Sequence, residues 1–221
     1  MASTTAQPEP LELVVFRYRE DVSWSDRWAG CRTLYNKGDD DAGVEGRTLE
    51  RLDDVGGEGE AYLRHIIRRY PDFADVTVFV QGGVADHCNA SMLSSLIEAF
   101  EGGRQPADWS GYVGLSRMWG GVTRYEDDRH LGDALPLREA CEAVGVVRFP
   151  VPPAWTAEEP TPSAEDGTWA CNYDNMFAVR RDRLLAHPKE SYERLLNDVL
   201  LARDPLGGFA VERMWTLMFA A

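Results

Sequence analysis

Runs of apolar residues, each closed by polar ones, predict alternating strands and helices along the chain. Val76–Val80 is an unbroken run of β-formers, which is typical of a central strand covered on both faces. It stops at Gln81-Gly82-Gly83, where two residues without side chains let the backbone turn sharply. The segments Leu11–Phe16, Arg32–Tyr35 and Met176–Val179 predict three further strands.

Helical spacing of apolar residues predicts the intervening elements. One face carries Leu63, Ile66, Ile67 and Tyr70, and Pro71 ends that helix because proline disfavours a helical residue before it. A second face carries Leu93, Leu96, Ile97 and Phe100, and the two glycines at 102–103 end it. We also expect a short helix around Trp24 and Trp28, a long helix from about Arg181 to Leu201, and a closing helix over residues 207–215.

The remaining segments are less regular. Residues 1–10 read as a disordered tail and the Asp- and Gly-rich residues 39–47 as a loop. Within the irregular segment 104–168, Val144–Val151 suggests a strand and residues 156–166 a crossing or lid containing two prolines. We therefore expect one α/β domain over residues 11–221, with one mixed sheet flanked by helices.

Composition excludes several classes of protein. The 221 residues carry a net charge of −14, which disfavours nucleic acid or an anionic membrane as the main partner. The four cysteines form no CxxC pair, so neither a zinc ribbon nor a disulfide framework is expected. The first ten residues lack the apolar stretch of a signal peptide, and no 18-residue apolar run predicts a membrane span. These features predict a soluble, cytoplasmic protein.

Polar clusters follow the predicted strands or open a predicted helix, and they are the strongest candidate chemistry. Ligands of open α/β sheets bind beyond the carboxyl ends of the strands, so parallel strands would bring the clusters to one edge. A solvated loop is the simpler explanation for any one cluster, but four together favour a polar cleft. The clusters are Arg17/Tyr18/Glu20/Asp21, Asn36/Lys37, Asp54/Glu58 and Asp86/His87.

Two clusters have more specific interpretations. The turn from Asp54 to Glu58 could present backbone N–H groups to a phosphate, or could simply cap the helix that follows. Asp86 and His87 supply an oxygen and a nitrogen ligand of the kind that Mn²⁺ accepts, although two ligands make a closed site only with help from a bound diphosphate. No Ser-His-Asp order or GxSxG elbow is present, which disfavours hydrolases of those types.

A set of motifs occurs in order over most of residues 11–101 and 169–219, and leaves residues 104–168 uncovered. They are Val15-Phe-Arg-Tyr-Arg-Glu-Asp-Val-Ser-Trp24, Tyr35-Asn-Lys-Gly38, Asp54-Val-Gly-Gly-Glu58, Tyr62-Leu-Arg-His-Ile66, Phe79-Val-Gln-Gly82 with Asp86-His87, Asn175-Met-Phe-Ala-Val179, and Gly208-Phe-Ala-Val-Glu-Arg213 with Trp215. Together they resemble an uncharacterised domain family that is similar to GT-A-type glycosyltransferases.

The resemblance implies a GT-A-like fold with a nucleotide-binding half over residues 11–101 and an acceptor half over 102–221. It places Asp86 near the usual metal-binding D-x-D, and Glu212 where such enzymes hold a base or an acceptor-binding carboxylate. Asp174 is the alternative base. The residues expected at the donor or cofactor are Arg17, Tyr18, Glu20, Asn36, Lys37, Asp54, Glu58 and Gln81, with Asp86 and His87 at a divalent cation (Mn²⁺ or Mg²⁺).

The sequence also departs from the family's pattern. No D-x-D follows the central strand, and Gly57 stands where the family has an arginine that could pair with phosphate. The resemblance leads us to expect transfer of a sugar from a nucleotide-sugar donor to a small-molecule or glycan acceptor, while the two departures favour the first alternative below. The alternatives are a metal-binding tailoring enzyme of a biosynthetic pathway that uses no nucleotide sugar, and a non-catalytic binding module on the same fold.

Overall fold

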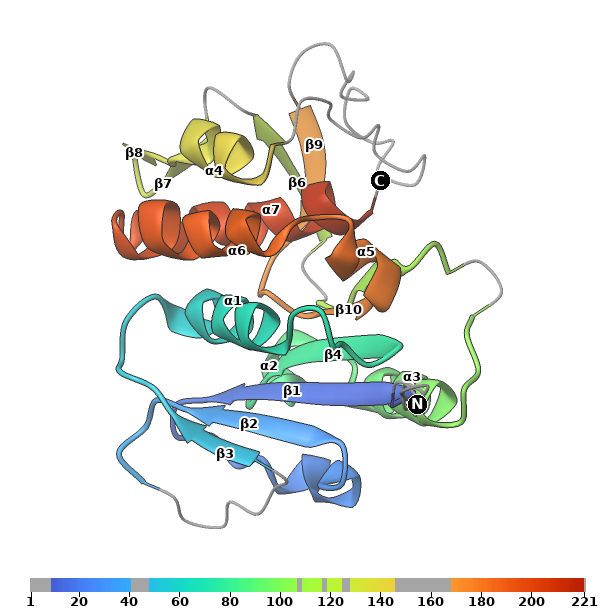
Figure 1. The fold of residues 1–221 in the computed structure, drawn as a ribbon. Coiled ribbons are helices and arrows are strands. Elements are labelled where there is room, and N and C mark those ends of the chain that lie inside the picture. The colour runs from blue at the N-terminus through green and yellow to red at the C-terminus, as the bar shows by residue number, and fades with distance from the viewer. Residues whose placement is uncertain are drawn as a thin grey trace, which may run out of the picture.

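A computed structural model describes residues 9–40, 48–106, 109–116, 119–124, 128–145 and 168–220. Its centre is a six-stranded sheet in the order β3-β2-β1-β4-β10-β5 (Figure 1). Strands β1, β2, β3 and β4 run parallel, while β10 is antiparallel to both of its neighbours. The expectation of a mixed α/β sheet flanked by helices is confirmed. The six strands are β1 (Leu11–Arg17), β2 (Arg32–Asn36), β3 (Thr48–Arg51), β4 (Val76–Gln81), β5 (Tyr112–Gly114) and β10 (Phe177–Arg180).

The strand predicted at Val76–Val80 is central and buried. All residues of Val76–Val80 are at most 2% exposed, and β4 lies between β1 and β10. Phe79 packs against Tyr62 and Phe177, with ring centroids 5.0 and 4.9 Å away. The strand is therefore covered on both faces, as its unbroken apolar run predicts.

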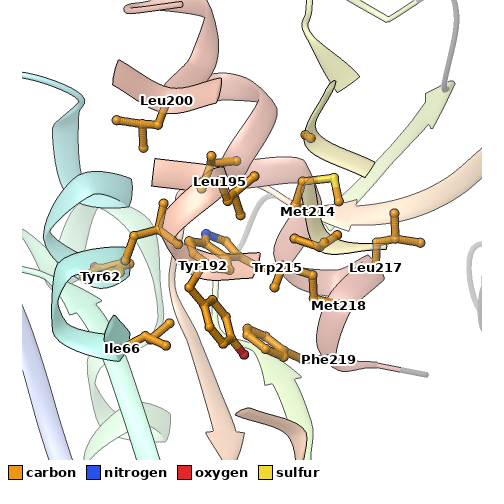
Figure 2. Close-up of a cluster of buried hydrophobic side chains, with 14 of the residues drawn as sticks. Tyr62, Ile66, Tyr192, Leu195, Leu200, Met214, Trp215, Leu217, Met218 and Phe219 are labelled. Carbon is orange, nitrogen blue, oxygen red and sulfur yellow. The ribbon is translucent and has the colours of Figure 1, made fainter. Parts of the chain in front are cut away.

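Helices cover the two faces of the sheet. One face carries α1 (Gly57–Arg69), α4 (Leu137–Val144), α5 (Arg181–Leu185), α6 (Lys189–Arg194), the π-helical segment Leu195–Leu201 (η3) and α7 (Leu206–Phe219). The other carries the 3₁₀ helix Ser23–Trp28 (η1) and α3 (Ala90–Glu101), while the short α2 (Val84–His87) follows β4. In Figure 1, α1 lies between the sheet and the layer formed by α6 and α7. Figure 2 shows the apolar cluster that joins this layer to α1, with Tyr62 and Ile66 facing Tyr192 and Trp215.

Two small sheets complete the described part of the chain. Strands β6 (Trp119–Arg124) and β9 (Thr168–Asn172) pair with each other, and β9 packs against α7. The hairpin of β7 (Arg129–His130) and β8 (Asp133–Ala134) forms the other. Strands β5 and β10 belong to the central sheet although they follow residue 101, so the sheet itself spans both expected halves.

Several expectations need correction. The long helix is interrupted after Leu185, because Pro188 cannot donate a helical hydrogen bond. Val144, expected to open a strand, ends helix α4, and residues 146–151 of that expectation lie outside the described residues, as do 1–8, 41–47 and 156–166. The carbonyls of Glu9 and Pro10, assigned to the tail, accept hydrogen bonds from Asp75 and Val76 N–H.

Candidate functional site

The carboxyl ends of the parallel strands meet at one edge of the sheet, as the strand-end clusters predicted. Arg17, Asn36 and Gln81 are the last residues of β1, β2 and β4. Backbone hydrogen bonds continue past these ends: Lys37 N–H donates to the Arg17 carbonyl (2.9 Å) and Gly82 N–H to the Phe16 carbonyl (2.7 Å). The polar side chains of this edge then divide into two groups.

The first group is already paired within the chain. Arg17 is 3% exposed, and its guanidinium donates to Asn36 Oδ1 (3.1 Å) and the Glu20 carbonyl (2.8 Å) and pairs with Asp40. Asn36 is fully buried and donates to the Asp40 carbonyl (2.7 Å). These contacts bind the segment after β2 to the end of β1. A donor phosphate would have to compete with Asp40 for Arg17.

Lys37 is engaged in the same way. Its ammonium is buried, lies 2.6 Å from Glu60 Oε2, donates to the Gly57 carbonyl (2.8 Å) and also contacts the Val55 carbonyl. Glu60 pairs in addition with Arg64. Lys37 thereby fixes the turn that precedes α1, the turn in which a phosphate site was expected.

The other expected donor contacts of this group lie at the surface. Tyr18 is 38% exposed, and Asp54 is exposed in the turn before α1. Glu20 Oε2 accepts from the backbone N–H groups of Tyr18 (2.7 Å) and Arg19 (3.1 Å). Their expected role at a donor remains a prediction.

The second group is organised by Asp174 and Asn175, which sit between β9 and β10. Both are in the left-handed region, with φ of 71° and 50°. The backbone N–H of Asp174 donates to Glu212 Oε1 (2.7 Å), and its carbonyl accepts from Gln81 Nε2 (2.6 Å). Its carboxylate accepts from Ser116 Oγ (2.6 Å). One residue thus links β4, the segment after β5, and α7.

Asn175 extends this link to α1. Its Nδ2 donates to Glu58 Oε1 (2.8 Å), which also accepts from Gln81 Nε2 (3.3 Å), and its Oδ1 accepts from Trp215 Nε1 (2.5 Å). The structure therefore brings four of the expected site residues, Glu58, Gln81, Asp174 and Glu212, into one hydrogen-bonded cluster. Ser116, Asn175 and Trp215 complete it. Asn175 and Trp215 lay within the quoted motifs, but no pattern in the sequence indicated their partners.

Glu212 has a strongly perturbed acidity. Burial raises the pKa of its carboxyl to about 7, and the negative charges of Glu58 and Asp174 act in the same direction. The Asp174 N–H and the Arg213 guanidinium, 3.1 Å from Oε2, oppose that rise. Arg213 also pairs with Asp128 (2.7 Å). A carboxyl that titrates near neutral pH can accept or release a proton under ordinary conditions.

A pocket of about 190 Å³ opens beside this carboxyl. It lies between the amino end of α1 and the start of α7, and residues 56–59 form one wall. Glu58, Asn175, Phe209 and Glu212 line it, with Asp204 at its exposed rim. Arg17, Asn36 and Asp86 do not line it. These residues share the sheet edge with Glu58, and a common pocket for Arg17, Asn36, Glu58 and Asp86 remains a prediction.

The proposed metal ligands Asp86 and His87 lie on α2, next to the cluster. Asp86 is exposed, and His87 Nδ1 lies 3.4 Å from Asp174 Oδ1. Among the described residues no group of three or more His, Cys, Asp or Glu side chains is arranged to hold a metal ion. Asp86 and His87 therefore do not by themselves form a closed cation site within the described residues, and their expected role at a divalent cation remains a prediction.

The fold and this edge define a mixed α/β protein with a carboxylate-rich site beyond the ends of its parallel strands. No protein-family model and no curated protein matches the sequence. One solved structure, a CMP:2-keto-3-deoxy-manno-octonic acid synthetase complexed with CTP, is similar over 86% of each chain, with 17% identity and a TM-score of 0.36. A likeness at this level carries no inference about function.

Within the described residues, no helix is both long and apolar enough to cross a membrane. None of the four cysteines, all of which are described, forms a disulfide.

Proposed function

We propose that this chain transfers a glycosyl group from a nucleotide-sugar donor to a hydroxyl or amine acceptor held in the pocket beside Glu212. The observation that carries the proposal is the Glu212 carboxyl, which is 12% exposed, lines a pocket at the carboxyl edge of the sheet and has its pKa raised to about 7. A general base works best when its pKa lies near the working pH.

The charges of the side chains that line the pocket indicate which class of acceptor it would bind. Glu58 and Glu212 line it and Asp204 stands at its rim, so a neutral polyol or an amine suits it better than a phosphate. Glu212 would take the proton of the acceptor as the acceptor oxygen or nitrogen bonds to the anomeric carbon. The bond from that carbon to the diphosphate breaks, and the nucleoside diphosphate leaves with the electron pair.

Asp174 is the weaker candidate for this base. Its carboxylate already accepts a hydrogen bond from Ser116 Oγ and contacts His87 Nδ1, and Asp174 does not line the pocket. Its contacts support a positioning role, since its backbone N–H holds one oxygen of Glu212.

The proposal is tested by a thermal-shift screen against UDP-, GDP- and dTDP-sugars, with and without Mn²⁺, followed by turnover of any stabilising donor. Ligands that bind only the native state raise its apparent stability. Glu212→Gln should lower turnover roughly 10²- to 10⁴-fold while the protein stays folded. Glu98→Gln, which removes an exposed carboxylate on α3, is the matched control and should leave turnover unchanged. Full activity of Glu212→Gln would reject Glu212 as the base.

A second candidate is binding or modification of a small polar molecule without a nucleotide. The pairing of Arg17 with Asp40 and of Lys37 with Glu60 favours it, because these cations were expected to hold the diphosphate. Asp40→Asn separates the two candidates. If Arg17 contacts a donor phosphate, loss of its ion pair with Asp40 should lower the dissociation constant of UDP or GDP several-fold, as measured by calorimetry. If no nucleotide stabilises either the wild type or this variant, the second candidate stands.

A further inference from the structure

A second cavity, of about 340 Å³, lies on the opposite part of α1 from the pocket beside Glu212. It is formed by the carboxyl half of α1, strands β2 and β3, and the α6–η3 segment, which packs beside α1 (Figure 1). It shares no lining residue with the first pocket. Its apolar wall consists of Leu52, Ile67 and Leu196 together with the ring of Tyr35.

The polar wall of this cavity is cationic. Arg64 and Arg68 stand one turn apart on α1, and Lys189 opens α6 across from them. Glu50 is the one carboxylate among the described residues that line it. A wall with three cations and one anion is unusual in a chain whose net charge is −14.

The present partners of these cations leave them able to bind a further anion. Arg68 is 61% exposed and pairs with Glu50, while Lys189 is 41% exposed and lies 3.7 Å from Glu193. The Lys189–Glu193 pair is exposed on both sides and contributes about 0–1 kcal/mol, so an added anion displaces it easily, while Arg68 keeps an exposed guanidinium beside the 20% exposed Glu50. Arg64 pairs with Glu60, whose charge is also neutralised by the buried Lys37. If a bound anion draws Arg64 away from Glu60, the Glu60 carboxylate therefore stays paired with Lys37 and is not left as an isolated buried charge.

We propose that this cavity binds a small organic anion, with a carboxylate or phosphate head at Arg64, Arg68 and Lys189 and an apolar body against Ile67 and Leu196. The two halves of the wall each supply what one half of such a ligand needs: charge-assisted hydrogen bonds for the head and apolar surface for the body. The site is independent of the proposed glycosyl transfer.

Titration calorimetry on the unmodified protein tests the ligand class, with each amphiphilic ligand kept below its critical micelle concentration. Octanoate and octyl phosphate carry both parts of the ligand, and comparing them distinguishes a carboxylate from a phosphate head. Acetate carries only the head, and octyltrimethylammonium carries the body with the opposite charge. We expect saturable binding of at least one of the first two and of neither of the last two. Equal binding of octyltrimethylammonium, or none by either octyl anion, overturns the proposal.

Variants locate the binding. Lys189→Glu and Arg68→Gln change exposed side chains and should weaken binding of the octyl anion about tenfold or more, as the loss of a hydrogen bond to a charged group predicts. Arg27→Gln is the matched control, because Arg27 is 57% exposed and pairs with Glu98 on the other face of the sheet. Binding that both cavity variants leave unchanged places the anion elsewhere and refutes the assignment.

Discussion

Replacing Glu212 by glutamine should remove a pH dependence from the stability of this protein. The side chain is 12% exposed, and burial raises the pKa of its carboxyl to about 7 from an ordinary 4.5. Glutamine is nearly the same size and carries no titratable proton. It stands in for the protonated acid, including the hydrogen bond that its oxygen accepts from Asp174 N–H.

The sign follows from proton binding. Between about pH 4.5 and 7 the folded protein keeps a proton on Glu212 that the unfolded chain has lost, so the free energy of unfolding falls as the pH rises through this range. Each unit of pKa difference is worth about 1.4 kcal/mol, and the pKa of about 7 already includes the opposing contact with Arg213, so we expect a total loss of about 3 kcal/mol. Below pH 4.5 the wild type and the variant should differ least.

The assay is urea denaturation of both proteins at pH 5 and pH 8. The variant should become more stable relative to the wild type by about 1–3 kcal/mol between the two pH values. Glu98→Gln controls for the loss of one negative charge at an exposed site, 43% exposed. A difference between Glu212→Gln and the wild type that is the same at both pH values would show that the carboxyl is ionised throughout. Glu212 would then not be a base with a near-neutral pKa, whatever the turnover assay gives.

Two further predictions concern the sheet. Phe79→Ala should lower the free energy of unfolding by roughly 3–5 kcal/mol, because it leaves a cavity at a fully buried site between Tyr62 and Phe177. Chemical denaturation measures this loss. A loss under about 1 kcal/mol would contradict the central position of β4 in the sheet. Gly38→Ala should lower the free energy of unfolding by about 1–3 kcal/mol, since the added Cβ would lie 1.4 Å from the Tyr18 carbonyl oxygen and the backbone must move. The same denaturation assay measures this. A variant as stable as the wild type would show that the segments after β1 and β2 do not meet at Gly38.

The sequence predicts the central elements of this fold because their apolar patterns are strong. The runs in β1 and β4 and the 3.6-residue spacing in α1 and α3 give the right elements within a few residues. Strand β3 was missed because Thr48-Leu-Glu-Arg51 holds a single apolar residue, and its pairing with β2 makes it a strand. The break before α6 was missed although Pro188 marks it, because the apolar spacing continues on both sides.

The position of the candidate site could be predicted from the sequence, but the ion-pair partners of its cationic side chains could not. Parallel strands place Arg17, Asn36 and Gln81 at one edge, and this follows from topology alone. The partners of the cations depend on tertiary contacts: Asp40 lies 23 residues from Arg17, and Glu60 lies 23 residues from Lys37. No local pattern shows that these charges are already neutralised within the chain.

The turn at Asp174 and Asn175 explains why the site depends on both halves of the chain. A left-handed conformation costs a non-glycine residue roughly 1–3 kcal/mol, and it persists only where surrounding contacts impose it. Here those contacts come from both sides of the sequence. Gln81 and Glu58 belong to the first half and Glu212 to the second, and each bonds directly to the turn. A change within the turn therefore alters folding and the geometry of the pocket together. Glu212 lies at the edge of this network and faces the pocket, so its replacement is the change that best separates chemistry from stability.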